Sequence, residues 1–230
     1  MVLDGEMTGL PVPSLRAHGR PLVAMRPVVR PPRLSELGCV PALSRSHRAV
    51  VIADSRGDLK DARREAELLA RSYGVSAALG PAATSAALFG AGPGDLLHVG
   101  THAQLQLSGG ALELYDQSLP ALEIAGHRGG PALAVLAACG SAASADDDAE
   151  LAGSLTTAFL ARGTPQVIGT LRPITDDGAA EVVGAFYADH GVTDPARALA
   201  RIQTRLAASG NKDWPNFALY GHDTCRKEPP

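Results

Sequence analysis

The sequence is poor in aromatic residues and contains no long apolar run. Phenylalanine, tyrosine and tryptophan make up 4% of the 230 residues, so a core must be built mainly from alanine, leucine and valine. No apolar run reaches the length that crosses a membrane. The N-terminus has no basic segment followed by an apolar stretch. We therefore expect neither a membrane span nor a secretory signal peptide.

Cysteine is also scarce. The three cysteines are Cys39, Cys139 and Cys225. An odd number of widely separated cysteines argues against a disulfide scaffold and for a reducing compartment. We therefore expect no disulfide framework and a cytoplasmic location.

The chain has no strong excess of charge of either sign. Its formal net charge is -3, with 20% charged and 45% hydrophobic residues. This balance is typical of a globular protein and does not favour nucleic acid or a membrane surface as a partner. The length predicts one large domain, although two small ones are also compatible with it.

Short apolar runs alternate with helical patterns along most of the chain. The runs that predict buried strands are residues 48–53, 95–100, 132–138, 166–171 and 217–220. Helical spacing marks residues 58–73, with Gly74 as the stop, and residues 149–161. Thr175 and Asp194 are helix-start residues for helices over residues 175–189 and 194–206, and Thr84 or Ser85 could cap a short helix. Residues 105–128 predict a small β excursion. Strands without alternating polarity imply a sheet covered on both faces. The expected fold class is α/β, a three-layer α/β/α sandwich with a mostly parallel sheet.

Two reactive side chains follow predicted strands. His102 comes after residues 95–100, and Cys139 comes after residues 132–138. Side chains beyond the carboxyl ends of neighbouring parallel strands meet at one edge of the sheet. A cysteine with an imidazole partner is the minimal set for thiol nucleophilic catalysis. The alternatives are a buried structural cysteine and a structural histidine.

A second histidine, His98, precedes His102 by four residues. On one strand the two would lie about 13 Å apart, too far to bind one metal ion. We therefore assign His98 to packing or to support of the site.

The segments around these residues resemble the two signatures of CHAT domains, a caspase-like family. They read LLHVGTHA (residues 96–103) and LAVLAACGSA (residues 133–142). Further similar segments are LDGEMTGLPVPSL near the start, DARREAELLARSYG, LARGTPQVIGTLRP and DWPNFALYG. The resemblance covers most of the chain. It implies a caspase-hemoglobinase fold, related to separases and TPR-CHAT proteases, and peptide-bond hydrolysis without cofactor or metal.

The resemblance also implies roles for individual residues. His102 matches the catalytic histidine and Cys139 the nucleophile. The backbone N–H groups of Ala103 and Cys139 would hold the oxyanion. Alanine stands at position 103 where the family usually has glycine, and a backbone donor survives that change.

Asp176 and Asp177 lie where related separases hold an acid that receives an arginine side chain at P1, the substrate residue before the scissile bond. The resemblance therefore implies a P1 pocket with one of these acids as the acceptor. The alternative is that both acids stabilise the N-terminus of the following helix. The acidic run at residues 146–150 is expected to be a solvated loop, or else to attract a basic substrate.

The domain division follows from composition and from the resemblance. Residues 1–47 are rich in proline and predict an extended N-terminal segment of the CHAT domain, with a short hairpin in residues 1–15. Residues 48–222 are expected to be the caspase-like core, and residues 223–230 a tail.

Two classes of function fit these observations. The first is a cysteine endopeptidase that cleaves a protein substrate, in a bacterial defence or cell-death pathway by family context. The second is a catalytically silent CHAT module used for docking or regulation. A nucleotide-binding Rossmann fold is disfavoured, because residues 92–94 (GPG) precede a strand instead of following one.

Control of such an endopeptidase is expected from outside its catalytic core. The chain opens almost directly on family-like sequence, so we expect no sensor domain within these 230 residues. A regulatory partner protein or proteolytic processing could then control it. The segments that could block the cleft are residues 25–41 and residues 140–150.

Overall fold

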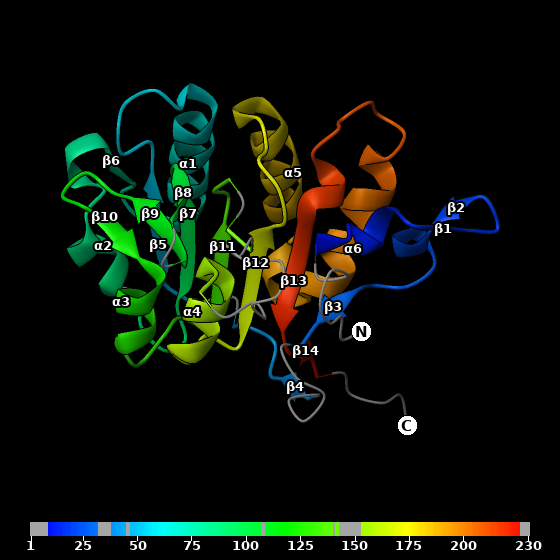
Figure 1. The fold of residues 1–230 in the computed structure, drawn as a ribbon, viewed down its shortest axis with the longest axis horizontal. Coiled ribbons are helices and arrows are strands. Elements are labelled where there is room, and N and C mark those ends of the chain that lie inside the picture. The colour runs from blue at the N-terminus through cyan, green and yellow to red at the C-terminus, as the bar shows by residue number, and fades with distance from the viewer. Residues whose placement is uncertain are drawn as a thin grey trace.

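The central feature of the fold is a seven-stranded sheet between two layers of helices (Figure 1). The computed structural model describes residues 9–31, 38–44, 47–106, 109–139, 141–142 and 153–225. The predicted three-layer α/β/α class is confirmed.

The central sheet is mostly parallel. Its order is β3-β13-β12-β11-β7-β5-β6. The bounds are β3 Val29–Arg30, β5 Ala49–Ala53, β6 Ala78–Leu79, β7 Leu96–Gly100, β11 Leu133–Leu136, β12 Gln166–Thr170 and β13 Phe217–Gly221. Only the β12–β13 pairing in this sheet is antiparallel. Strands β5, β7, β11 and β12 are parallel neighbours, so their carboxyl ends share one edge.

Three long helices cover one face of this sheet. They are α1 (Lys60–Tyr73), α5 (Asp176–Ala188) and α6 (Pro195–Leu206). Their apolar stripes pack on alternate residues of the strands, among them Val51, Val135 and Ile168. Burial of this apolar area is the main force that holds the layer to the sheet.

Shorter elements cover the opposite face. They are α2 (Ser85–Phe89), α3 (Ala121–Gly126), α4 (Leu155–Ala161) and a small antiparallel sheet of β8 (Ala103–Gln106), β9 (Gly109–Glu113) and β10 (Ser118–Pro120). Phe159 of α4 is fully buried in this second core. The small sheet accounts for the β excursion expected in residues 105–128.

The predicted helix boundaries follow their capping residues. Thr84, Thr175 and Asp194 each accept a backbone N–H of the first turn of their helix, in α2, α5 and α6. Gly74 ends α1 with a φ of 64°, a left-handed conformation that costs glycine little. Helix α4 begins at Leu155, and residues 149–152 of the predicted helix lie outside the described part.

The N-terminal region is joined to the core. It contains the 3-10 turns η2 (Val12–Ser14) and η3 (Leu22–Ala24) around the hairpin β1 (Arg16–Ala17) and β2 (Arg20–Pro21). Residues 1–8 of the hairpin expected at residues 1–15 lie outside the described residues. Strand β3 then pairs with β13, so this segment contributes an edge of the central sheet.

The expectation of no disulfide is wrong, because Cys39 and Cys225 are bonded to each other. Strand β4 (Cys39–Val40) pairs in parallel with β14 (Asp223–Thr224), which brings together residues 186 positions apart in sequence. Residues 223–225 are thus tied to the N-terminal region. Disulfides are typical of oxidising compartments, so cysteine usage no longer supports a cytoplasmic location. Cys139 is free.

Within the described ranges, no helix is both long and apolar enough to span a membrane. The same ranges contain no group of three or more histidine, cysteine or acidic side chains placed to hold a metal ion.

Candidate active site

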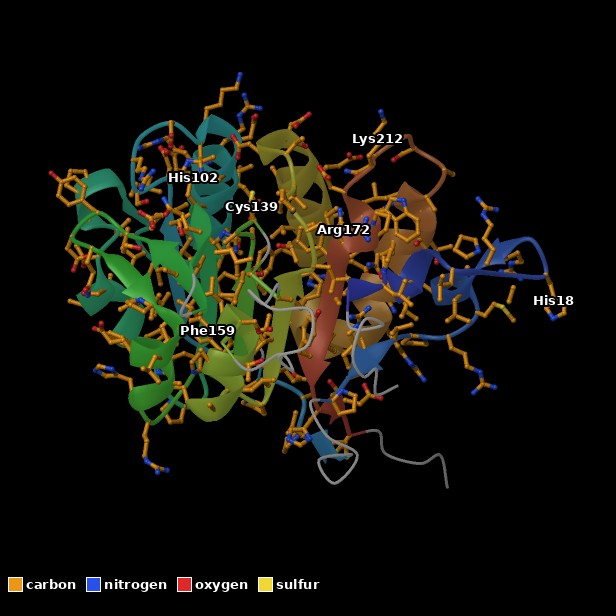
Figure 2. All side chains as sticks on the ribbon, viewed as in Figure 1. His18, His102, Cys139, Phe159, Arg172 and Lys212 are labelled. Atoms are coloured by element: carbon orange, nitrogen blue, oxygen red, sulfur yellow. A yellow bond between two sulfur atoms is a disulfide. The ribbon has the colours of Figure 1, made fainter. Side chains whose placement is uncertain are left out.

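His102 and Cys139 lie beyond the same edge of the central sheet (Figure 2). Strands β7 and β11 are parallel neighbours, with Leu96 opposite Leu133 and Val99 opposite Leu136. His102 follows the end of β7 by two residues, and Cys139 follows the end of β11 by three. The register therefore brings the two chain segments out side by side.

Both side chains line one pocket of about 100 Å³ between the sheet edge, α1 and α5. The complete lining is Leu59, Ala62, Glu65, Thr101, His102, Ala137, Cys139, Ile174, Thr175, Asp176, Ala179 and Ala180. Its walls are mainly aliphatic, with the thiol, the imidazole and two carboxyl groups as its reactive side chains. A thiol beside an imidazole in such a pocket can act as a nucleophile toward a carbonyl carbon.

The turn that carries Cys139 is fixed to β12 by buried hydrogen bonds. The Thr170 hydroxyl donates to the Ala138 carbonyl at 2.6 Å, and the Thr170 N–H donates to the Ser141 hydroxyl at 2.8 Å. Ser141 and Thr170 are both fully buried. The Cys139 thiol donates to the Ile174 carbonyl at 3.3 Å. The nucleophile is thus held from β12 and from the loop before α5.

His102 has a carboxylate partner that the sequence analysis did not identify. Its Nε2 lies 3.0 Å from Oδ1 of Asp58. Asp58 follows β5, whose carboxyl end lies at the same edge as that of β7. The rule that placed His102 and Cys139 would also have found Asp58, had it been applied to the first strand. When Asp58 accepts from Nε2–H, the other nitrogen, Nδ1, remains to exchange a proton.

The Ala103 N–H faces away from the small sheet. The Glu113 N–H donates to the His102 carbonyl at 2.9 Å, which makes these two residues a hydrogen-bonded pair. The next opposed pair, Ala103 and Leu112, is then of the non-hydrogen-bonded kind. Strand β8 is an edge strand, so this N–H is directed to the outer side of the sheet.

The two acidic residues proposed for P1 lie at the start of α5. Both oxygens of Asp176 accept backbone N–H groups of α1, from Asp61 and Ala62, at 2.9 Å each. Helix α1 has no side-chain cap of its own, so Asp176 supplies one. Asp177 is exposed and does not line the pocket. The Thr175 hydroxyl and the Gly178 N–H hold the pKa of Asp177 below its usual value. The contacts of Asp177 favour the interpretation that it stabilises the N-terminus of α5, whereas Asp176 caps α1 and not the helix that follows it.

A buried polar cluster lies beneath the pocket. Nε2 of His98 is 3.3 Å from Oε1 of Glu65, and the Tyr187 hydroxyl is 3.2 Å from Nδ1 of His98. Burial lowers the pKa of His98 to about 4. Burial, with a smaller effect of the Asp176 charge, raises the pKa of Glu65 well above its usual value. Both directions favour uncharged groups, so we interpret the contact as a neutral pair and not as a salt bridge.

Glu65 was not identified from the sequence, although a signal existed. It shares the buried face of α1 with Ala62, Ala66 and Leu69, where an acidic residue is unusual. His98 was assigned to packing or site support, and its complete burial at the base of the site agrees with that interpretation. The acidic run at residues 146–150, and residues 140 and 143–150 of the loop after Cys139, lie outside the described residues.

Comparisons with solved structures identify caspase-like cysteine proteases. Separase in the Saccharomyces cerevisiae separase–securin complex aligns with a TM-score of 0.58 and 14% identity, over 82% of this chain and 13% of that one. The Arg-specific cysteine proteinase gingipain R aligns with a TM-score of 0.52 and 14% identity, over 77% of this chain and 46% of that one. At such identities the likeness concerns the fold. This chain spans less than half the length of either protein.

A comparison with curated proteins finds no match. The model of the CHAT domain family matches residues 1–222. The match covers nearly the whole chain, including both segments that carry His102 and Cys139. The chain therefore belongs to the CHAT domain family.

Proposed function

We propose that the chain is a cysteine endopeptidase that cleaves a protein substrate, with Cys139 as nucleophile and His102 as its proton-transfer partner. The observation that carries this proposal is the shared pocket of the two side chains, beyond the ends of adjacent parallel strands. The fold of the neighbouring cysteine proteases supports it.

The reaction has two stages. The Cys139 thiolate attacks the scissile carbonyl carbon, and the backbone N–H groups of Ala103 and Cys139 stabilise the oxyanion. His102 gives a proton to the leaving amine, which departs and leaves a thioester on Cys139. His102 then takes a proton from water, which attacks the thioester and releases the acid product. Asp58 positions the imidazole throughout.

The silent-module alternative makes a different prediction for the thiol. A docking module needs no reactive Cys139 and no dependence on His102. The test is labelling of the purified chain by peptidyl acyloxymethyl ketones with varied P1 residues, located by peptide mass spectrometry. Labelling confined to Cys139, and much slower in a His102→Ala variant, supports the peptidase.

The matched variant is Cys139→Ala. This change removes the thiolate and little volume, so we expect complete loss of labelling and of proteolysis with an unchanged melting temperature. Cleavage of the same substrate by Cys139→Ala at the wild-type rate would disprove the nucleophile. If wild-type Cys139 reacts no faster with these probes than a free thiol does, the silent module is the better description.

Regulation by a partner protein or by proteolytic processing is part of the proposal, in a bacterial defence or cell-death setting. An endopeptidase without restraint would damage its own cell. We expect low basal turnover from the 230-residue chain, raised by a partner or by a cut in residues 25–41 or 140–150. The measurement is the rate of substrate cleavage before and after limited proteolysis.

A further inference from the structure

We propose that the groove between the N-terminal segment and α6 is a docking surface for an acidic segment of a partner protein that also carries aliphatic side chains. The groove has a volume of about 420 Å³. This inference goes beyond the proposed peptidase activity and does not depend on it, because it concerns binding at a surface away from Cys139.

Two elements that are far apart in the sequence form the walls of this groove. The turn η3 packs against α6 (Figure 1). One wall consists of residues 23–27, and the other consists of Arg197, Ala200, Arg201 and Thr204. The spacing of these four residues places them on one face of α6. The groove thus runs between a helix face and the chain segment packed beside it.

The walls carry positive charge and no acidic residue of their own. Residues 9–31 and α6 contain no aspartate or glutamate, although the whole chain has a formal net charge of -3. The exposed arginines of these two parts are Arg16, Arg20, Arg26, Arg197, Arg201 and Arg205. This part of the surface is therefore basic on a chain that is slightly acidic as a whole, and it attracts acidic partners.

The three arginines that line the groove can each accept a further carboxylate. Arg26 takes part in none of the ion pairs among the described residues. Arg201 is paired with Asp189 at 2.5 Å, and Arg197 lies 3.8 Å from Asp194. The side chains of Arg197 and Arg201 are 52% and 57% exposed. A guanidinium has five N–H donors, so both keep donors for a second acceptor.

The surface between the arginines is apolar. Val23 and Ala200 line it and are buried, and Met25 lines it with 48% of its surface exposed. A methionine adapts its shape to different aliphatic side chains. Burial of apolar surface supplies binding energy that exposed ion pairs alone do not give. The groove therefore fits a peptide in which acidic and aliphatic residues alternate.

The lining favours a peptide over a nucleic acid. None of the described residues that line the groove is aromatic, so it offers no ring on which a base can stack. Asp189 and Asp194 lie beside two of the arginines and repel a continuous phosphate backbone. A peptide can instead place a carboxylate at Arg26 and its aliphatic side chains on the apolar surface.

The first experiment measures the binding of defined peptides to the full chain by fluorescence anisotropy. The acidic probe is Glu-Asp-Leu-Glu-Asp-Leu-Glu-Asp. One control peptide carries glutamine and asparagine in place of the acids, and another carries serine in place of the leucines. We expect the acidic probe to bind at least about tenfold more tightly than the amide peptide, with an affinity that falls as salt is added. The serine peptide should bind more weakly than the acidic probe.

Arg26→Glu tests the charge of the groove. It should weaken binding of the acidic probe by at least about tenfold, because it reverses a charge that no ion pair occupies. The matched control is Arg128→Glu, at an exposed position after α3 on the opposite face of the central sheet. It changes the net charge equally and should alter the affinity by less than about twofold. Both variants should keep the wild-type melting temperature, since both side chains are exposed.

Met25→Ser tests the apolar surface. It should remove the advantage of the acidic probe over the serine peptide and leave the binding of the serine peptide unchanged. Equal binding of the acidic and amide peptides, no binding of either, or equal effects of Arg26→Glu and Arg128→Glu would overturn the inference. Tighter binding of oligothymidylate than of the acidic probe, lost in Arg26→Glu, would make the groove a nucleic-acid site and overturn it as well.

The second experiment keeps the docking surface separate from the proposed function. The groove shares no lining residue with the pocket beside Cys139, and α5 lies between α6 and α1 (Figure 1). A saturating amount of the acidic probe should therefore not slow the labelling of Cys139 by a peptidyl ketone. Slower labelling that persists in Arg26→Glu would place the probe at the active site and overturn the docking surface. Binding that depends on Arg26, in a chain whose Cys139 is unreactive, supports the docking surface and rejects the peptidase.

Discussion

At the scale of single residues, the structure distinguishes a residue placed for the reaction from residues that support it. His102 lines the pocket, whereas Asp58 contacts only Nε2 of His102. His98 is completely buried behind them. Substitution at these three positions should therefore affect turnover, orientation and stability respectively.

We expect His102→Ala to lower kcat by about 10²–10⁴-fold, since general acid–base assistance is worth that much. Asp58→Asn should lower kcat less and leave KM unchanged. Its side chain is 57% exposed, and solvent weakens such a pair. The measurement is steady-state cleavage of one peptide by each variant. An Asp58→Asn enzyme with normal kcat would show that the contact with His102 has no positioning role.

His98→Ala should act on stability more than on kcat. The change leaves a cavity in the core and deprives the Tyr187 hydroxyl of its partner, at a cost of about 2–4 kcal/mol. Urea unfolding gives the free energy. A larger loss of kcat in His98→Ala than in His102→Ala would reverse the assignment of the two histidines.

The titration of Glu65 should make the free energy of unfolding of the chain depend on pH. Its pKa is raised in the folded state by burial and by Asp176, so the folded chain keeps a proton that the unfolded chain loses above pH 4.5 or so. The folded state then binds more protons, and its stability falls as pH rises above that value. Glu65→Gln removes this loss.

We therefore expect Glu65→Gln to exceed the wild type in free energy of unfolding at pH 7–8, with a difference that shrinks toward pH 4. Glu67→Gln is the control, and its difference from wild type should not depend on pH in this way. His98 acts in the opposite direction, because its lowered pKa of about 4 makes stability rise from that pH to about 6.5 in both proteins. A pH-independent difference for Glu65→Gln would mean that Glu65 is ionised in the fold.

At the scale of elements, the turn that carries Cys139 depends on its contact with β12. Thr170, on that strand, is hydrogen-bonded both to the residue before Cys139 and to Ser141. The neighbouring Gly169 has no room for a side chain, because a Cβ there would lie 2.4 Å from the methyl group of Thr156. Strand and turn are therefore closely fitted.

Thr170→Val keeps the shape of the side chain and removes its hydroxyl. We expect a loss of about 1–3 kcal/mol in stability, since the Ala138 carbonyl is left without that donor. Labelling of Cys139 should slow as well. Thr204→Val, at an exposed position of α6, is the control and should change stability by less than about 0.5 kcal/mol. Equal effects of the two substitutions would show that the hydroxyl does not hold the turn.

The disulfide is the feature of the whole molecule with the clearest consequence. It joins β4, within the N-terminal segment, to β14, the strand after β13. We expect reduction, or a Cys39→Ser, Cys225→Ser double variant, to lower the free energy of unfolding by about 2–4 kcal/mol. The thermal unfolding of Cys139→Ala should respond to reductant as the wild type does. A melting temperature unaffected by reductant would show that this bond does not stabilise the fold.

Local signals predicted most of the elements of this molecule. The helix starts at Thr84, Thr175 and Asp194 and the stop at Gly74 agree with the structure, because capping is set by neighbours in sequence. The short strands followed from their apolar runs. The adjacency of β7 and β11 was a condition of the predicted site, and the structure shows that the two strands are paired.

The pairing of distant residues was not predictable in the same way. Cys39 and Cys225 were not expected to pair, because no local sequence pattern predicts that β4 and β14 are neighbours. Asp176 looked like a cap for its own helix or a P1 acceptor, whereas it caps α1.

The sequence by itself determined the layered α/β fold, the membership in the CHAT domain family and the candidate pair His102 and Cys139. Apolar periodicity, caps and short motifs are properties of adjacent residues, and they survive without knowledge of the packing. Only the tertiary structure decided which helix Asp176 caps. That outcome depends on how α1 and α5 pack against each other, which places both oxygens of Asp176 on backbone N–H groups of α1.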